Sequence, residues 1–254
     1  MKNCIIIAGA NGEIGNEFIK TFLPKNKVIA ISRNNRIGLH HSNLSTVTVD
    51  LASPPEVEKA FSNFDPTLYK RVIFIHSIGR DKFENTNYPK IEVTDTIDPD
   101  VYSSNVNTYK FLARLLIKKV EIARETCPVE LKLVMIGSVA DKYGLLVITS
   151  FSESKNIVRG YMRNAVSRFP WVSALVINIS STITKSASQV RTYADTSYWL
   201  TPSEVSDRSW KDILSLKKGY REIEIYKKDP EFSENYYSDE SAVFKRWAKY
   251  AWGK

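Results

Sequence analysis

Residues 3–15 read NCIIIAGANGEIG, and this stretch decides the fold. Its opening part, Asn3–Ala8, is a continuous apolar run, which is typical of a strand buried on both faces of a parallel sheet. Gly9, Gly12 and Gly15 then follow in the pattern G-x-x-G-x-x-G, and apolar residues recur at helical spacing beyond them. Such glycines allow a tight turn, let the backbone approach a pyrophosphate and pack helix against strand. The stretch therefore predicts a strand, a phosphate-binding turn and a helix whose N-terminus faces the phosphates.

Outward from this unit, apolar runs of strand length alternate with stretches of helical periodicity. The expected strands are Asn3–Ala8, Lys27–Ile31, Leu44–Val49, Arg71–His76, Leu131–Ile136, Trp171–Ile179 and Arg221–Tyr226. The expected helices are Glu13–Leu23, Pro54–Phe64, Pro99–Thr126, Phe151–Arg168, Pro202–Lys217 and Asp239–Ala251. This alternation predicts an α/β fold, a doubly wound parallel sheet (Rossmann fold) with helices on both faces. We interpret residues 1–254 as a single domain, with a substrate cleft formed mainly by residues 180–220 and with a C-terminal helix at 239–251.

The composition excludes several classes of protein. With 43% hydrophobic and 25% charged residues among 254, the chain differs from disordered, collagen-like and coiled-coil sequences. Its apolar runs are shorter than the roughly 20 residues that a membrane-spanning helix needs. The first residues lack a secretory cleavage site, so we expect a cytoplasmic protein. Two cysteines and three histidines, without ligand spacing, predict neither a disulfide framework nor a metal site.

The net charge of +8 is compatible with an anionic partner. The basic residues are spread along the chain, and no run of five or six like charges marks a tail. This distribution favours a solvated surface together with a site for a phosphate-bearing cofactor. We therefore expect no nucleic-acid partner.

The end of the second strand indicates which cofactor binds. In units that bind NAD, an acidic residue about 20 positions past the glycines holds the ribose hydroxyls. Here Ser32 and Arg33 occupy that place, and Arg36 follows. An arginine can pair with the 2′-phosphate of NADP, so we favour NADP(H) over NAD(H). The alternative is that both arginines are solvated loop residues.

These features resemble the short-chain dehydrogenase/reductase family over residues 3–227. Asp50-Leu51 resembles the segment with the family's adenine-contacting Asp, and Gly137-Ser138-Val139-Ala140 the segment with its catalytic serine. His76-Ser77-Ile78-Gly79 stands where the family has Asn-Asn-Ala-Gly, with only the glycine matching, and Leu200–Val205 resembles the start of a late helix. The glycine turn, the strand end and the resemblance together imply a cofactor site of Gly9, Asn11, Gly12, Glu13, Ile14, Gly15, Ser32, Arg33, Asp50, Leu51, Ser77, Gly79 and Lys155.

The sequence departs from the family at its catalytic pair, Tyr-x-x-x-Lys. Phe151 stands in the tyrosine position, whereas Ser154 and Lys155 match. In the family the tyrosine hydroxyl transfers a proton, the nearby ammonium favours its ionised form, and the serine hydrogen-bonds the substrate oxygen. The resemblance implies catalytic positions at Ser138, Phe151, Lys155 and Asn105, with Asn107 as the alternative asparagine.

Two functions follow from this departure. The first is an NADP(H)-dependent oxidoreductase that acts on a small-molecule carbonyl or alcohol. Phe151 is then an engineered change, or its role passes to Tyr143 or to water; Tyr143 could equally be a loop aromatic that only lines the pocket. The second is a non-catalytic NADP(H)-binding protein that serves as a sensor or interaction partner. The resemblance further implies a homodimer or homotetramer.

The substrate pocket and the last helix complete the expectations. The pocket is expected from residues 80–98, 141–148 and 182–201, with an aromatic lining drawn from Tyr88, Tyr143, Tyr193, Tyr198 and Trp199. In the last helix, Phe244 and Trp247 form part of an apolar stripe, with basic residues away from it. Such a helix docks on its own domain or on a partner subunit, or it lies on a membrane surface; we favour docking.

Overall fold

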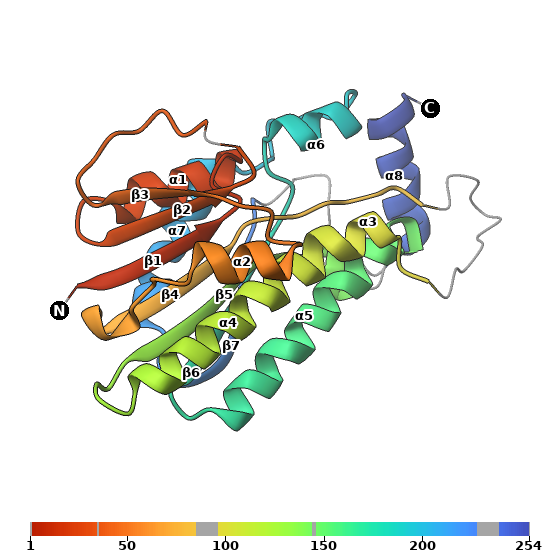
Figure 1. Ribbon diagram of the computed structural model, residues 1–254. Coiled ribbons are helices and arrows are strands. Elements are labelled where there is room, and N and C mark those ends of the chain that lie inside the picture. Colours follow the sequence, from red (N-terminus) through yellow and green to blue (C-terminus); the bar gives the residue numbers. More distant parts are fainter. Residues whose placement is uncertain (1, 35, 85–95, 144–145, 228–238, 254) are drawn as a thin grey trace.

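A computed structural model describes residues 2–34, 36–84, 96–143, 146–227 and 239–253, without the side chains of residues 143, 146, 240, 251 and 252. Its centre is a parallel sheet in the order β3-β2-β1-β4-β5-β6-β7 (Figure 1). The strands are β1 Asn3–Ala8, β2 Lys27–Ser32, β3 Leu44–Thr48, β4 Arg71–His76, β5 Glu130–Ser138, β6 Val172–Ile179 and β7 Gly219–Ile225. The strand order reverses between β1 and β4, which is where open sheets of this kind place their ligands. The predicted doubly wound α/β fold is therefore confirmed.

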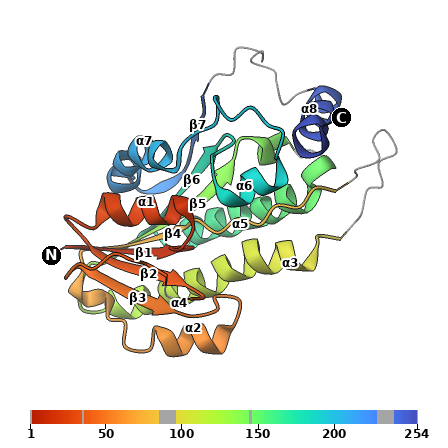
Figure 2. The ribbon, with the colours of Figure 1, turned by 90° about the horizontal axis from the view of Figure 1, so that it is seen from above.

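Helices cover both faces of the sheet, as seen from above in Figure 2. One face carries α1, Glu13–Phe22, and α7, Pro202–Ser215; the other carries α2, Pro54–Ala60, α4, Thr108–Ala123, and α5, Thr149–Arg168. Because side chains alternate along a strand, the apolar run of β1 supplies both faces. Ile5 and Ile7 pack on the α1 side, while Cys4 and Ile6 pack on the α4 side.

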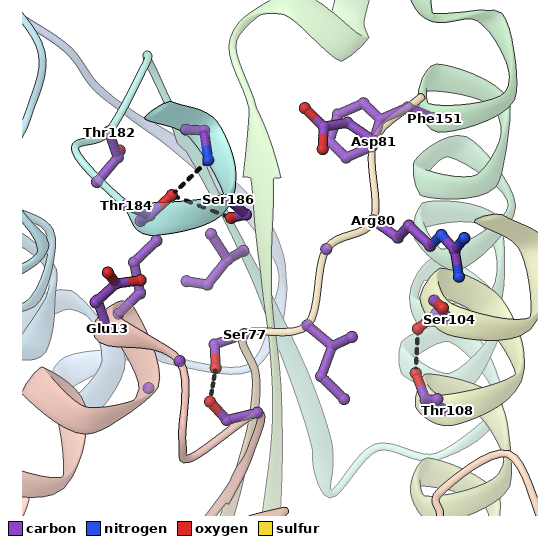
Figure 3. A pocket seen from close by; sticks show the side chains of 18 of the residues that line it. Glu13, Ser77, Arg80, Asp81, Ser104, Thr108, Phe151, Thr182, Thr184 and Ser186 are labelled. Carbon is purple, nitrogen blue, oxygen red and sulfur yellow. Dashed lines mark hydrogen bonds between the residues drawn. The ribbon is translucent and has the colours of Figure 1, made fainter. Parts of the chain in front are cut away.

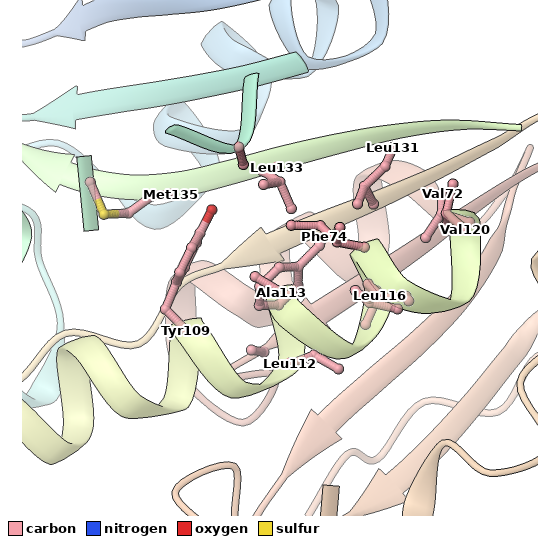
Figure 4. Close-up of a cluster of buried hydrophobic side chains, with 14 of the residues drawn as sticks. Val72, Phe74, Tyr109, Leu112, Ala113, Leu116, Val120, Leu131, Leu133 and Met135 are labelled. Atoms are coloured by element: carbon pink, nitrogen blue, oxygen red, sulfur yellow. The ribbon is translucent and has the colours of Figure 1, made fainter. Parts of the chain in front are cut away.

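The core under α4 shows how these layers are held together (Figure 4). Phe74 of β4 packs against Tyr109, with ring centroids 5.5 Å apart. Leu112 and Leu116 continue the same face of α4, and all four residues are fully buried. Burying one such apolar side chain contributes about 1.5–3 kcal/mol, so this contact fixes the position of α4 beneath the sheet.

The structure differs from the sequence prediction in the long helix after β4. The expected helix over Pro99–Thr126 is divided into α3, Pro99–Tyr102, a π-helical turn, Ser103–Asn107, and α4. A π turn contains one more residue than an α turn, so it shifts the helix register at this point. Hydrophobic spacing does not reveal such a change, because the flanking turns remain helical.

Short helical segments near the carboxyl ends of the strands were also not predicted. They are α6, Lys185–Val190, and the 3-10 turns Ala140–Tyr143 and Leu146–Ile148, with another, Pro66–Leu68, before β4. None of the residues of α6 is buried, so it has no apolar stripe for a periodicity argument. Its start is set locally, because the Thr184 side chain accepts a hydrogen bond from the Ala187 N–H.

The last helix, α8, Glu240–Trp252, packs on the body of the domain. Val243 and Trp247 are buried in a cluster with Val147 and Ile148. This confirms the expectation that the apolar stripe docks. None of the described helices has the length and apolar character needed to cross a membrane.

Candidate functional site

A cavity of about 920 Å³ opens at the carboxyl ends of the strands. Figure 3 shows side chains from the glycine turn, the β4 loop, α5 and the β6–α6 segment around this space. The predicted site residues on its wall are Gly9, Asn11, Gly12, Glu13, Ile14, Gly15, Ser32, Arg33, Asp50, Leu51, Ser77, Gly79, Ser138, Phe151 and Lys155. Predicted residues from the ends of five strands, β1 to β5, thus meet at one place with two from α5.

The glycine turn is shaped by close backbone contacts. Gly9 has φ +81°, a conformation that side chains rarely adopt. A Cβ on Gly15 would lie 2.3 Å from the Gly9 carbonyl oxygen, so α1 is packed directly against the turn. A Cβ on Gly12 would meet only that same oxygen, at 3.2 Å. Gly12 begins α1 without a side-chain capping bond, so the helix N-terminus fits an anionic phosphate group.

Two polar side chains of the turn are held by neighbouring segments. Asn11 Nδ2 donates to the backbone and side-chain oxygens of Asn34, at 2.6 and 2.5 Å. Glu13 Oε1 accepts from the Lys185 N–H at 2.9 Å. The first contact ties the turn to the end of β2, and the second ties α1 to the start of α6.

The β2 and β3 ends form the part of the cavity farthest from α5. Arg33 and Arg36 line it, and Ser32 Oγ donates to the Asn34 carbonyl at 2.6 Å. Asp50 is a local turn residue here, since its Oδ1 accepts from the Ala52 N–H at 3.0 Å. Leu51 is buried beside it. This end can hold an apolar ring and pair with a phosphate.

The loop after β4 crosses the middle of the cavity. Ser77 Oγ donates to the Ala8 carbonyl at 2.7 Å, which joins the ends of β4 and β1. A Cβ on Gly79 would lie 3.8 Å from Lys155 Nζ and 4.0 Å from the Phe151 ring. The loop backbone therefore passes directly over the predicted catalytic pair.

Lys155 is buried at the base of the cavity. Its Nζ donates to the carbonyls of Ile78, at 3.2 Å, and Ile136, at 3.1 Å. Burial lowers the pKa of Lys155 from 10.5 to about 8, with Asp141 acting against the change. The ammonium lies 5.5 Å from the centroid of the Phe151 ring, one helical turn away on α5. The Phe151 ring thus lies beside this ammonium and carries no hydroxyl.

Asn105 lies behind the cavity wall, in the π turn, and is fully buried. Its Oδ1 accepts from the Arg80 N–H at 2.8 Å, and its Nδ2 donates to the Arg80 carbonyl and to Ser154 Oγ, at 3.0 and 2.9 Å. The side chain therefore fastens the β4 loop to α5. Its geometry is that of a positioning residue for the predicted pair.

The wall around Phe151 contains two aromatic residues that the sequence analysis did not name, although Phe83 falls within the expected pocket segment 80–98. Phe83 and Trp247 line the cavity, with ring centroids 5.8 Å apart. The stripe on α8 predicted that Trp247 docks but not where. Tyr193 and Tyr198, which were expected in the pocket, are exposed instead.

Three other aromatic residues expected in the pocket are not seen lining it. Trp199 is buried beneath the Arg191 guanidinium, 4.5 Å from it. Tyr88 and the side chain of Tyr143 fall outside the residues that the structure describes. Within those residues, no three His, Cys, Asp or Glu side chains gather as a metal site.

Comparison with known proteins gives a likeness of structure. No protein-family model matches the chain, and no curated protein matches its sequence. Among solved structures, ElxO with NADP bound has a TM-score of 0.68 at 14% identity, covering 88% of this chain and 98% of that one. A short-chain dehydrogenase from Burkholderia cenocepacia J2315 in complex with NADP has a TM-score of 0.69 at 15% identity, covering 96% of both chains.

An actinorhodin polyketide ketoreductase with NADPH is similar to the same degree. Its TM-score is 0.68 at 18% identity, with 87% of this chain and 95% of that one covered. Sequence identities this low carry no information on the reaction. The likeness establishes that this chain shares the doubly wound, seven-stranded fold of these proteins.

Proposed function

We propose that this chain is an NADP(H)-dependent oxidoreductase of the short-chain dehydrogenase/reductase type, acting on a small carbonyl or alcohol. One observation carries the proposal: the glycine turn, Arg33, Ser138 and Lys155 line the same cavity. The names of three similar structures support it, because each was solved with NADP or NADPH.

The cofactor would lie along the cavity from the β3 end to α5. The N-terminus of α1 would hold the pyrophosphate, and Arg33 the 2′-phosphate. Asp50 and Leu51 would contact the adenine, and Lys155 a ribose hydroxyl. When bound, the nicotinamide ring supplies or accepts a hydride at the substrate carbon.

The chain's own residues would bind and orient the substrate. Ser138 would donate a hydrogen bond to the carbonyl oxygen, which becomes more negative as the reaction proceeds. Phe83, Phe151 and Trp247 would contact the body of the substrate, so we propose a substrate with an apolar or aromatic group next to its carbonyl. Since Phe151 has no proton to give, the oxygen would be protonated from Tyr143 or from water.

Phe151 also supports a second candidate, an NADP(H)-binding protein without catalysis. General acid–base assistance is typically worth 10²–10⁴-fold in rate. A site without it keeps its cofactor contacts and loses most of its turnover. The chain would then act as a sensor or interaction partner whose state depends on bound NADP(H).

Two measurements separate these candidates. Calorimetry with NADPH and NADH tests the cofactor site, and we expect NADPH to bind more tightly than NADH. NADPH oxidation with a panel of aromatic and aliphatic aldehydes and ketones tests the reaction, with Ser138→Ala as the matched control. Turnover that Ser138→Ala abolishes supports the oxidoreductase. Binding without turnover supports the second candidate, and absence of NADPH binding refutes both.

We also propose a homodimer or homotetramer in the cytoplasm. The family resemblance is the basis for the assembly. Light scattering of the purified protein at micromolar concentration tests the first, with a monomer mass as the contrary result. Fractionation of the native host's cells tests the second.

A further inference from the structure

A buried ion pair lies directly behind the turn that carries Ser138. Arg159 Nη2 is 2.6 Å from Asp141 Oδ1, and the two side chains are 4% and 0% exposed. Neither residue lines the cavity described above. Burying two charges is costly even when they are paired, because both lose their hydration. A hydrophobic pair would fill this space at lower cost, so the position of these charges calls for an explanation.

The second oxygen of the carboxylate holds the Ser138 turn. Asp141 Oδ2 accepts from the Ser138 N–H at 2.9 Å, and Ser138 Oγ accepts from the Ala140 N–H at 3.1 Å. Arg159 follows Lys155 by one turn of α5. The carboxylate thus connects the backbone of Ser138 to the helix that carries Lys155.

The guanidinium is anchored on its other side by the sheet. Arg159 Nη2 donates to Asn178 Oδ1 at 2.7 Å, and Asn178 Nδ2 donates to Glu222 Oε2 at 2.9 Å. A Cβ on Gly137 would lie 2.6 Å from Asn178 Oδ1 and 3.1 Å from Arg159 Nη2. The residue before Ser138 must therefore be glycine for this network to fit.

We propose that Asp141 and Arg159 are positioning residues of the cleft, which fix the Ser138 turn relative to Lys155 and place one charge of each sign near its ammonium. The effect on turnover rests on the proposed function, whereas the effect on the geometry and charge of the site does not. Asn178 and Glu222 complete the network by holding Arg159.

The two members of the pair act on Lys155 in opposite directions. The Asp141 carboxylate raises the pKa of Lys155, and the Arg159 guanidinium lowers it. Asp81, on the loop after β4, also raises this pKa, and the buried His76 of β4 interacts with Lys155 as well. If the pair served only stability, removing either partner would loosen the turn in the same way. The two removals would then not shift the pKa of Lys155 in opposite directions.

The test is the titration of Lys155 in the whole protein, followed by NMR of lysine labelled with ¹³C at Cε. The Lys155 signal is identified by its loss in Lys155→Met. Asp141→Asn, which keeps the volume, is expected to lower the midpoint by on the order of one pH unit, and Arg159→Gln to raise it similarly. Arg159→Lys, which keeps the charge, should restore the wild-type midpoint.

The matched control is Arg163→Met, one further turn along α5. Arg163 also pairs with Glu222, at 3.2 Å, but it is 58% exposed. We expect this variant to leave the Lys155 midpoint unchanged. If Asp141→Asn does not fold, the double variant Asp141→Asn/Arg159→Gln, which removes both charges, takes its place. Its midpoint should lie below that of Arg159→Gln and no more than one pH unit below that of the wild type. Midpoints that do not move, or that move in the same direction in both single variants, overturn the proposal.

Turnover provides a second, separate readout. In any protein form that oxidises NADPH, Asp141→Asn should lower kcat at least ten-fold while NADPH affinity changes less than two-fold, because Ser138 acts on the substrate. If no form turns over, the proposed function fails, and the lysine titration still decides whether the pair acts on Lys155.

Discussion

Phe151 places an aromatic ring without a hydroxyl beside the buried ammonium of Lys155. The ring lies 5.5 Å from the Lys155 ammonium, which also donates to two backbone carbonyls. A tyrosine ring fills the same space as a phenylalanine, so Phe151→Tyr would add one oxygen without changing the packing of α5. The chemistry that we propose for the site thus depends on a single atom.

Phe151→Tyr should restore turnover. The new hydroxyl would stand where a donor is needed, and the neighbouring ammonium would favour its ionised form. We expect kcat with a suitable carbonyl to rise at least a hundred-fold, at the low end of acid–base catalysis. NADPH affinity should change little, since the hydroxyl acts mainly in the transition state. Steady-state NADPH oxidation measures the gain.

Ser138→Ala in the Phe151→Tyr background is the control, and it should remove most of the gain. An inert Phe151→Tyr protein that still binds NADPH would favour the non-catalytic candidate. An active wild type that Tyr143→Phe inactivates would assign the proton to Tyr143 instead.

Arg33 should decide between the two nicotinamide cofactors. A charge-assisted contact to the 2′-phosphate is worth about 1.5–3 kcal/mol, so Arg33→Ala should weaken NADPH binding by roughly ten- to a hundred-fold. NADH lacks that phosphate, and its affinity is the internal control. Calorimetry with both cofactors checks the prediction, and equal losses for the two would contradict it.

At the scale of elements, two glycines at the start of α1 meet different needs, one for folding and one for ligand binding. Gly15 has no space for a Cβ, whereas Gly12 borders only the Gly9 carbonyl at 3.2 Å and otherwise faces the cavity. Two glycines of one motif therefore have different roles, one in packing and one in leaving room for a ligand.

Gly12→Val and Gly15→Ala should consequently fail in different ways. Gly12→Val should keep the fold and lose NADPH binding, because its branched side chain occupies the phosphate position. Gly15→Ala should lower the free energy of unfolding, because a Cβ at 2.3 Å from the Gly9 oxygen forces α1 away from β1. Thermal unfolding and calorimetry measure the two effects. Normal NADPH affinity in Gly12→Val would remove the turn from the site.

The sequence predicts those elements whose residues carry a periodic signal. The buried strands are apolar runs, and the ring of Phe151 stands beside Lys155 because residues four apart share a helix face. The π turn and α6 carry no such signal. The Asp141–Arg159 pair could not be predicted from the sequence for another reason. The chain has many charged residues, and only the fold determines which two of them meet.

At the scale of the whole molecule, the site places three ionisable side chains in the buried interior. Lys155 and Arg159 on α5 and Asp141 after β5 are all buried, although each can carry a charge. Burial lowers the pKa of Lys155 to about 8, which means that the folded protein holds this proton less firmly than the unfolded chain. The stability of the molecule must therefore depend on pH through this residue.

The sign of that dependence follows from proton binding. Between pH 8 and about 10.5 the unfolded chain binds more protons at Lys155 than the folded protein does, so the Lys155 contribution to stability rises with pH in this window. One pKa unit corresponds to about 1.4 kcal/mol, which gives a rise of roughly 3 kcal/mol. Lys155→Met has no amine and should show no such rise. Burial raises the pKa of Tyr109 well above its usual value of 10, and this effect is the same in both proteins and cancels in the difference.

Urea unfolding, followed by tryptophan fluorescence at pH 7.5 and pH 10.5, measures this difference. The free energy of unfolding of the wild type should be lower than that of Lys155→Met at pH 7.5. This difference between the two proteins should become smaller at pH 10.5. Lys132→Met is an informative comparison, because burial also lowers the pKa of Lys132 to about 8, at the far end of the sheet from the cavity. A stability difference between wild type and Lys155→Met that stays constant across this range would show that Lys155 titrates normally. Its ammonium would then be hydrated in the cavity, and the close contact with the Phe151 ring could not hold.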